Sequence, residues 1–98
     1  MASGQPTQNW AAHPSLWVGY DQAGGYQVER SLLRFDVSAI PAGSQINSAA
    51  IRLFLGGTTT NDAPMAVAVH RVRSDWPETI TWNGSLGLTV DPLPAATT

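Results

Sequence analysis

Residues 31–55 read SLLRFDVSAIPAGSQINSAAIRLFL and contain two apolar strand candidates joined by a short turn. In both candidates, residues 33–37 and 49–55, apolar side chains recur at every second position, which is the period of a half-buried strand. Pro41 fixes φ and Gly43 tolerates a positive φ, so the chain reverses between the candidates, with a connection longer than a two-residue hairpin. We therefore predict a sheet with one apolar and one polar surface.

The rest of the chain continues this pattern of short strands and turns. Strands are expected over residues 15–20, 26–37 (with a bulge or bend near Arg30), 64–73 and part of 75–83, with turns or loops at 21–25 and 56–62. No helix is expected. Strands at roughly ten-residue spacing predict an all-β protein, an antiparallel β-sandwich of jelly-roll type. We expect one domain over residues 1–98, with an extended lead-in at 1–14 and an extended tail at 84–98.

Composition excludes several classes of partner. The chain has 98 residues, a net charge of −2, and five arginines but no lysine, so it offers no basic face to nucleic acid or to an anionic membrane. No apolar run approaches the roughly 20 residues that span a bilayer, and no signal peptide is visible, which fits mature secreted material or a cytosolic chain. The absence of cysteine excludes disulfides and thiolate chemistry.

Three segments together resemble one known family. They are Asn9-Trp10 with residues 15–19, residues 30–36 running through 49–55, and residues 72–83, which end in DWPETITWN. In this order they resemble the DNRLRE (disaggregatase-related) domain, a β-sandwich of secreted and cell-surface proteins that is akin to carbohydrate-binding modules. The resemblance spans residues from about 5 to 94 and implies a secreted or cell-surface location.

The chain departs from that family at both ends. The opening strand and the strands after Asp91-Pro92 are missing, so the resemblance implies a sandwich with unpaired edges. We expect another chain, either a second copy or a complementary partner, to supply strands, with the lead-in and the tail as donors.

No catalytic arrangement is visible, and we predict that the chain is not an enzyme. Its ionisable residues match no catalytic spacing. His13 precedes Pro14 in the lead-in and His70 ends an Ala-Val strand, so both are interpreted as structural.

The tryptophan-rich segment is the best candidate binding site. On a strand, Trp76, Glu78 and Trp82 would share one face, and a carboxylate between indoles can hold a sugar ring. The alternative is that both indoles fill the core. Trp17, on its own strand, has the same two interpretations.

Charged residues add two further candidates. Arg34, Asp36 and Arg52 lie on polar faces of the two central strands, either as a cross-strand ion pair or, with the arginines, as a platform for a sugar. We expect no cofactor, with calcium held by Asp21, Asn61 and Asp62 as the alternative.

Two functions remain open. The first is a structural or adhesive module that assembles into a filament or complex by strand complementation. The alternative is a carbohydrate-binding module of a cell-surface, polysaccharide-active protein.

Overall fold

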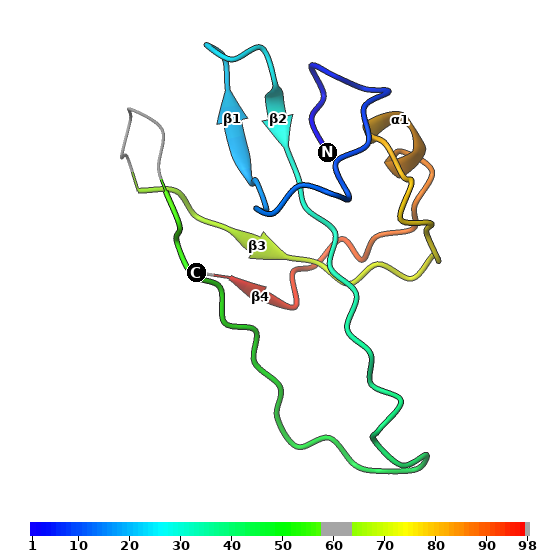
Figure 1. Cartoon of the computed structure of the whole chain (residues 1–98). Coiled ribbons are helices and arrows are strands. Elements are labelled where there is room, and N and C mark those ends of the chain that lie inside the picture. The colour runs from blue at the N-terminus through cyan, green and yellow to red at the C-terminus, as the bar shows by residue number, and fades with distance from the viewer. Residues whose placement is uncertain (58–63, 98) are drawn as a thin grey trace. The chain divides into compact units, whose positions relative to one another are not determined.

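The computed structural model describes residues 1–57 and 64–97. The chain divides into two compact units: unit 1 comprises Met1–Ser31 and Ala63–Thr98, and unit 2 comprises Leu32–Asp62 (Figure 1). Each unit is described by itself. The single domain expected over residues 1–98 stays a prediction.

The first sheet of unit 1 is a hairpin. Strands β1 (Gly19–Asp21) and β2 (Gln27–Glu29) pair antiparallel, with Tyr20 opposite Val28. The Asp21 carboxylate accepts a hydrogen bond from the Gly24 amide at 2.8 Å and so closes the turn. The turn predicted at residues 21–25 is confirmed. The strand predicted at 15–20 is displaced, because it begins only at Gly19.

The lead-in pairs along the free edge of β2. The Ser3 and Gly4 amides donate to the carbonyls of Val28 and Tyr26, and the Arg30 amide donates to the Met1 carbonyl, at 2.8–2.9 Å. Ala2 is 3% exposed and is the buried apolar side chain recorded in the described residues. A Cβ added at Gly4 would lie 1.9 Å from the Gly25 carbonyl oxygen, so glycine is what allows this approach.

The tail of unit 1 also returns along the same chain. Strands β3 (Ala68–Val69) and β4 (Ala96–Thr97) pair antiparallel, and Val72 forms a bridge with Val90. The two pairings are separated by residues 92–94, where two prolines have no amide hydrogen to donate. The lead-in and the tail, which were predicted to be strand donors to another chain, are thus paired within their own chain.

A single helical turn contradicts the prediction that no helix is present. Helix α1 (Trp82–Ser85) begins after Thr81, whose hydroxyl accepts from the Gly84 amide at 3.4 Å. Threonine is a favoured N-cap, and this local bond competes with an extended backbone. The strand predicted within residues 75–83 is replaced by a turn and this helix.

Unit 2 holds the two central strand candidates, and neither is a strand. Residues 32–57, the described part of the unit, form two extended legs that Figure 1 draws without arrows. Two successive turns join them, closed by the Ile40 amide on the Val37 carbonyl at 3.0 Å and the Ser44 amide on the Pro41 carbonyl at 3.2 Å. Gly43 has φ of 81°, so the predicted Pro-Gly turn is confirmed. The predicted pairing of the legs is wrong, because tandem turns do not place two strands in hairpin register.

The described residues therefore confirm antiparallel β structure in two small two-stranded sheets. A sandwich or jelly roll stays a prediction. No helix in the described part of the chain has the length and apolar character needed to cross a membrane.

Candidate functional site

The tryptophan-rich segment predicted as the site is folded as a turn and a helix. The Ile80 amide donates to the Pro77 carbonyl at 3.0 Å, so Glu78 lies inside a tight turn, while Trp82 lies on α1. The common strand face predicted for Trp76, Glu78 and Trp82 is therefore wrong, since proline at the start of this segment favours a turn.

This turn is held by the lead-in. The Asn9 side-chain amide donates to the carbonyls of Glu78 and Ile80, at 2.8 and 2.9 Å. The Asn83 amide donates to the Pro6 carbonyl at 3.1 Å. Segments about 70 positions apart are thus fixed together by bonds that a hydrophobic pattern does not reveal.

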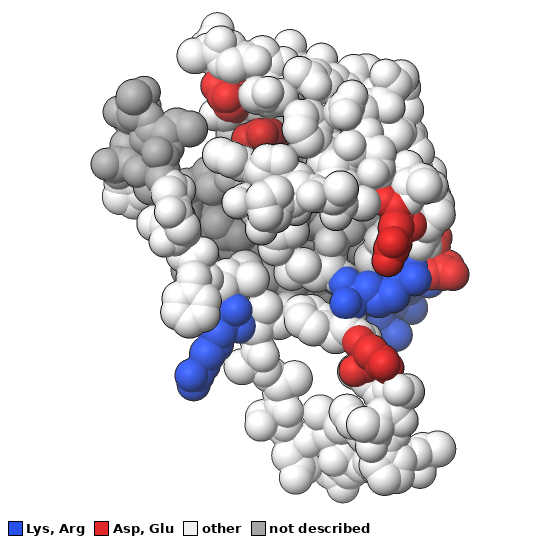
Figure 2. Space-filling model, viewed as in Figure 1, with Lys and Arg blue, Asp and Glu red and all other residues white. Residues whose placement is uncertain are grey.

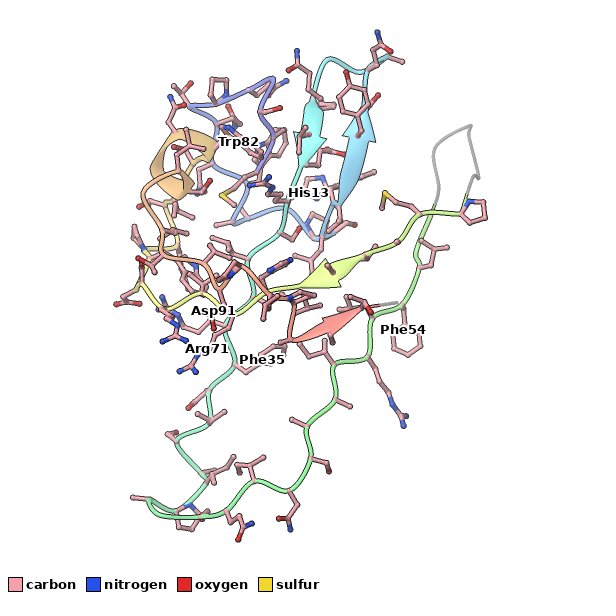
Figure 3. The ribbon with its side chains drawn as sticks, turned by 180° about the vertical axis from the view of Figure 1, so that it is seen from behind. His13, Phe35, Phe54, Arg71, Trp82 and Asp91 are labelled. Carbon is pink, nitrogen blue, oxygen red and sulfur yellow. The ribbon has the colours of Figure 1, made fainter. Side chains whose placement is uncertain are left out.

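Trp82 is covered on one side by a cation. The Arg30 guanidinium carbon lies 5.0 Å from the centre of the Trp82 ring, a cation–π contact, and the indole is half-buried. Figure 3 labels Trp82 above His13 in the view from behind. Trp76 is half-buried as well. These features favour a packing role for both indoles, as in the alternative interpretation above.

A second group of rings offers a more exposed surface. Tyr26, Trp10, His13 and Trp17 form a row of edge-to-face contacts, with centroid separations of 5.8, 6.1 and 6.1 Å. Trp10 is half-buried, and its indole N–H is buried with no recorded partner. Trp17 ends the row and is 46% exposed. The row thus supports one outward-facing indole from the side of the protein.

The Trp17 indole is also fixed by hydrogen bonds. Its Nε1–H donates to His13 Nδ1 at 3.4 Å, and the Ser15 amide donates to the same nitrogen at 3.1 Å. Because Nδ1 accepts both bonds, the neutral imidazole carries its proton on Nε2. The Ser31 hydroxyl donates to the Trp17 carbonyl at 2.8 Å. An exposed aromatic ring held in this way is suited to stacking against a flat apolar ligand face.

Sequence reasoning gave this group only part of its weight. Trp17 was recognised as a candidate and His13 as structural, but the contact between them was missed. The signal is the spacing of Trp10, His13 and Trp17 within eight residues.

A charged cluster lies where the tail meets β3. Arg73 forms an ion pair with Asp91 through Nε and Oδ1, and a second bond joins Nη2 to Oδ2 at 3.3 Å. These bonds, with a smaller contribution from Arg71, lower the pKa of the Asp91 carboxyl. His70 Nδ1 lies 2.9 Å from the Asp91 carbonyl oxygen. Figure 2 shows basic and acidic side chains mixed on the viewed face, and Figure 3 labels Arg71 and Asp91 close together. The cluster anchors the tail.

The calcium alternative gains little from the structure. Asp21 uses one carboxylate oxygen for its turn, and Asn61 and Asp62 lie outside the described residues. Partial burial raises the pKa of Glu29, and nearby Asp21 raises it further. No group of three His, Cys, Asp or Glu side chains suited to a metal occurs within residues 1–57 and 64–97.

The charged residues of the central strands lie in unit 2. Asp36 Oδ1 accepts from the Ser38 amide at 2.9 Å, and hydrogen bonds to Ser38 lower the pKa of this carboxyl. No ladder joins the legs in the described part of unit 2, so the cross-strand setting predicted for Arg34, Asp36 and Arg52 is not formed.

Comparison with known proteins gives one match. The model of carbohydrate-binding module family 96 matches residues 1–90. No curated protein matches the chain, and no solved structure does. The predicted kinship with carbohydrate-binding modules is confirmed, whereas the DNRLRE assignment stays a prediction.

Proposed function

This chain belongs to carbohydrate-binding module family 96, and from that premise we propose that it is a non-catalytic module that binds a polysaccharide at the exposed indole of Trp17. The family match supports the ligand class. The fixed, outward-facing ring supports the site, and it is the structural observation on which the proposal depends.

The chemistry follows from the shape of a sugar. A pyranose ring has an apolar face of C–H groups and a rim of hydroxyls, so an indole can cover the face while polar groups bond the rim. Trp17 needs little reordering on binding because His13 and Ser31 already hold it. Preorganisation of this kind lowers the entropy cost of association.

A neighbouring aromatic residue can extend the surface. Tyr20, on β1, is 66% exposed, and its phenol combines an apolar ring with a hydroxyl that donates or accepts. Polysaccharide chains are extended, and more than one aromatic contact along the chain raises affinity for the polymer above that for a single sugar.

The site predicted from sequence remains a second candidate surface for the same function. Glu78 is exposed in its turn, and Trp76 and Trp82 are half-buried in the same segment. We rank this surface below Trp17, because the Arg30 guanidinium already occupies one face of Trp82.

We further propose a secreted or cell-surface location, where structural polysaccharides are met. The accessory role of a binding module also agrees with the lack of any catalytic spacing among the ionisable residues.

The test is a binding survey with the purified chain. Neutral and acidic polysaccharides are titrated by isothermal calorimetry, and each is also incubated with the chain and assayed for released reducing ends. The proposal expects binding to at least one polymer and no cleavage. Cleavage abolished by Glu78→Gln or His70→Asn would overturn the non-catalytic assignment, and the absence of any binding would overturn the ligand class.

A further inference from the structure

The first leg of unit 2 exposes an apolar row beside a charged row. Leu33, Phe35 and Val37 are all exposed, with Phe35 at 59%, and Arg34 and Asp36 lie between them along the chain. The described residues record no strand at this leg. An extended segment outside any ladder presents amide and carbonyl groups to which another strand can add.

The order of side chains along this leg is self-complementary. If two copies of residues 33–37 run antiparallel with Phe35 opposite Phe35, then Leu33 lies opposite Val37 and Arg34 lies opposite Asp36. The second copy repeats both pairs, because the arrangement has twofold symmetry. Side chains of one row then meet only apolar partners, and those of the other row meet only opposite charges.

We propose that this leg is an interface at which two copies of the chain associate through antiparallel pairing of residues 33–37. The two reciprocal Arg34–Asp36 pairs set the register, and the apolar row is covered in the same step.

The second leg does not have this property. Pairing residues 51–55 with themselves about Leu53 places Arg52 opposite Phe54, so the single cation has no acidic partner. Pairing about Arg52 would place two cations against each other, which is unfavourable. Charge complementarity thus selects the first leg and a second copy of the same chain.

The strength of association follows from the short length of the interface. Two five-residue strands form a marginal sheet when isolated. We therefore expect a weak, concentration-dependent dimer that weakens further as salt screens the exposed ion pairs.

Charge reversal tests the register directly. In sedimentation equilibrium over a range of concentrations, Arg34→Asp and Asp36→Arg should each raise the dimer dissociation constant at least about tenfold, because like charges then meet at two places. Equimolar mixing of these two variants should restore association as a heterodimer, since acidic residues of one copy now face basic residues of the other. Arg52→Asp is the matched control and should leave the constant unchanged.

A single cysteine gives a second readout. The chain has no cysteine, and residues directly opposite in an antiparallel pair have Cα atoms about 4.5–5.5 Å apart, within reach of a disulfide. Phe35→Cys should form a covalent dimer on oxidation, whereas Leu53→Cys should remain mostly monomeric. A monomer at all concentrations, or a dimer that both reversals leave intact, would overturn the proposal.

Discussion

The indole nitrogen of Trp17 donates a hydrogen bond to Nδ1 of His13 across 3.4 Å. The two rings also meet edge to face, with centroids 6.1 Å apart. His13 therefore positions the exposed ring both by packing and by accepting its hydrogen.

Two substitutions separate these contributions. His13→Phe keeps an aromatic ring but has no acceptor, and His13→Asn places an amide oxygen near the position of Nδ1 but has no ring. We expect the Trp17 indole N–H resonance, identified by its loss in Trp17→Phe, to shift toward its solvent-exposed position in His13→Phe and to shift less in His13→Asn.

The same contact predicts a dependence on pH. When the imidazole gains its second proton, Nδ1 becomes a donor and can no longer accept from Trp17. The Trp17 indole resonance should therefore move together with the His13 ring resonances during acidification, and it should be insensitive to pH in His13→Asn. An indole resonance that ignores His13 protonation would contradict the positioning role.

Asn9 should be important for stability although it is exposed. Its side chain donates to two carbonyls of the 78–80 turn and accepts from the Ala11 amide. Asn9→Ala should lower the free energy of unfolding by about 1–3 kcal/mol, measured by urea denaturation. Gln8→Ala is the control and should cost less, because Gln8 Nε2 makes one long bond of 3.4 Å to the neighbouring Asn9 carbonyl. Equal losses in the two variants would contradict this role.

The Arg73–Asp91 pair should make stability sensitive to acid. The folded state lowers the pKa of Asp91, chiefly through its hydrogen bond with Arg73. A lowered carboxyl pKa means that the stabilisation is present above the unfolded pKa and is lost as pH falls through the folded pKa.

Thermal unfolding between pH 7 and pH 2 checks this expectation. Asp91→Asn should lower Tm at pH 7, and the difference from the unchanged chain should vanish in strong acid. Glu78→Gln serves as the control at an exposed turn position. A deficit of Asp91→Asn that persists at pH 2 would show that the side chain acts by packing and not by charge.

Local signals in the sequence predicted the turns well. Asp21 with the following glycines, and Pro41 with Gly43, carry the side-chain bond or backbone freedom that their turns use. These features depend on neighbouring residues only, so one sequence is enough to find them.

Pairings between distant segments could not be predicted. The alternation in residues 33–37 and 49–55 defines faces but not partners, and the structure joins the legs by tandem turns instead of a ladder. Asn9 on the 78–80 turn and Arg30 over Trp82 are likewise specific to three-dimensional packing. The preference for Trp76, Glu78 and Trp82 assumed a strand, which Pro77 and the Thr81 cap replaced with a turn and a helix.

Binding of polysaccharide at Trp17 is tested most directly by removing its indole. Calorimetric titration of the best-bound polymer should give a dissociation constant at least about tenfold higher for Trp17→Ala, because the contact area of one aromatic side chain is lost. Leu16→Ala, at an adjacent exposed apolar position, should bind as the unchanged chain does. A folded Trp17→Ala variant that binds with unchanged affinity, while Trp82→Ala loses binding and remains folded, would contradict the assignment of Trp17 and transfer the site to the segment around α1.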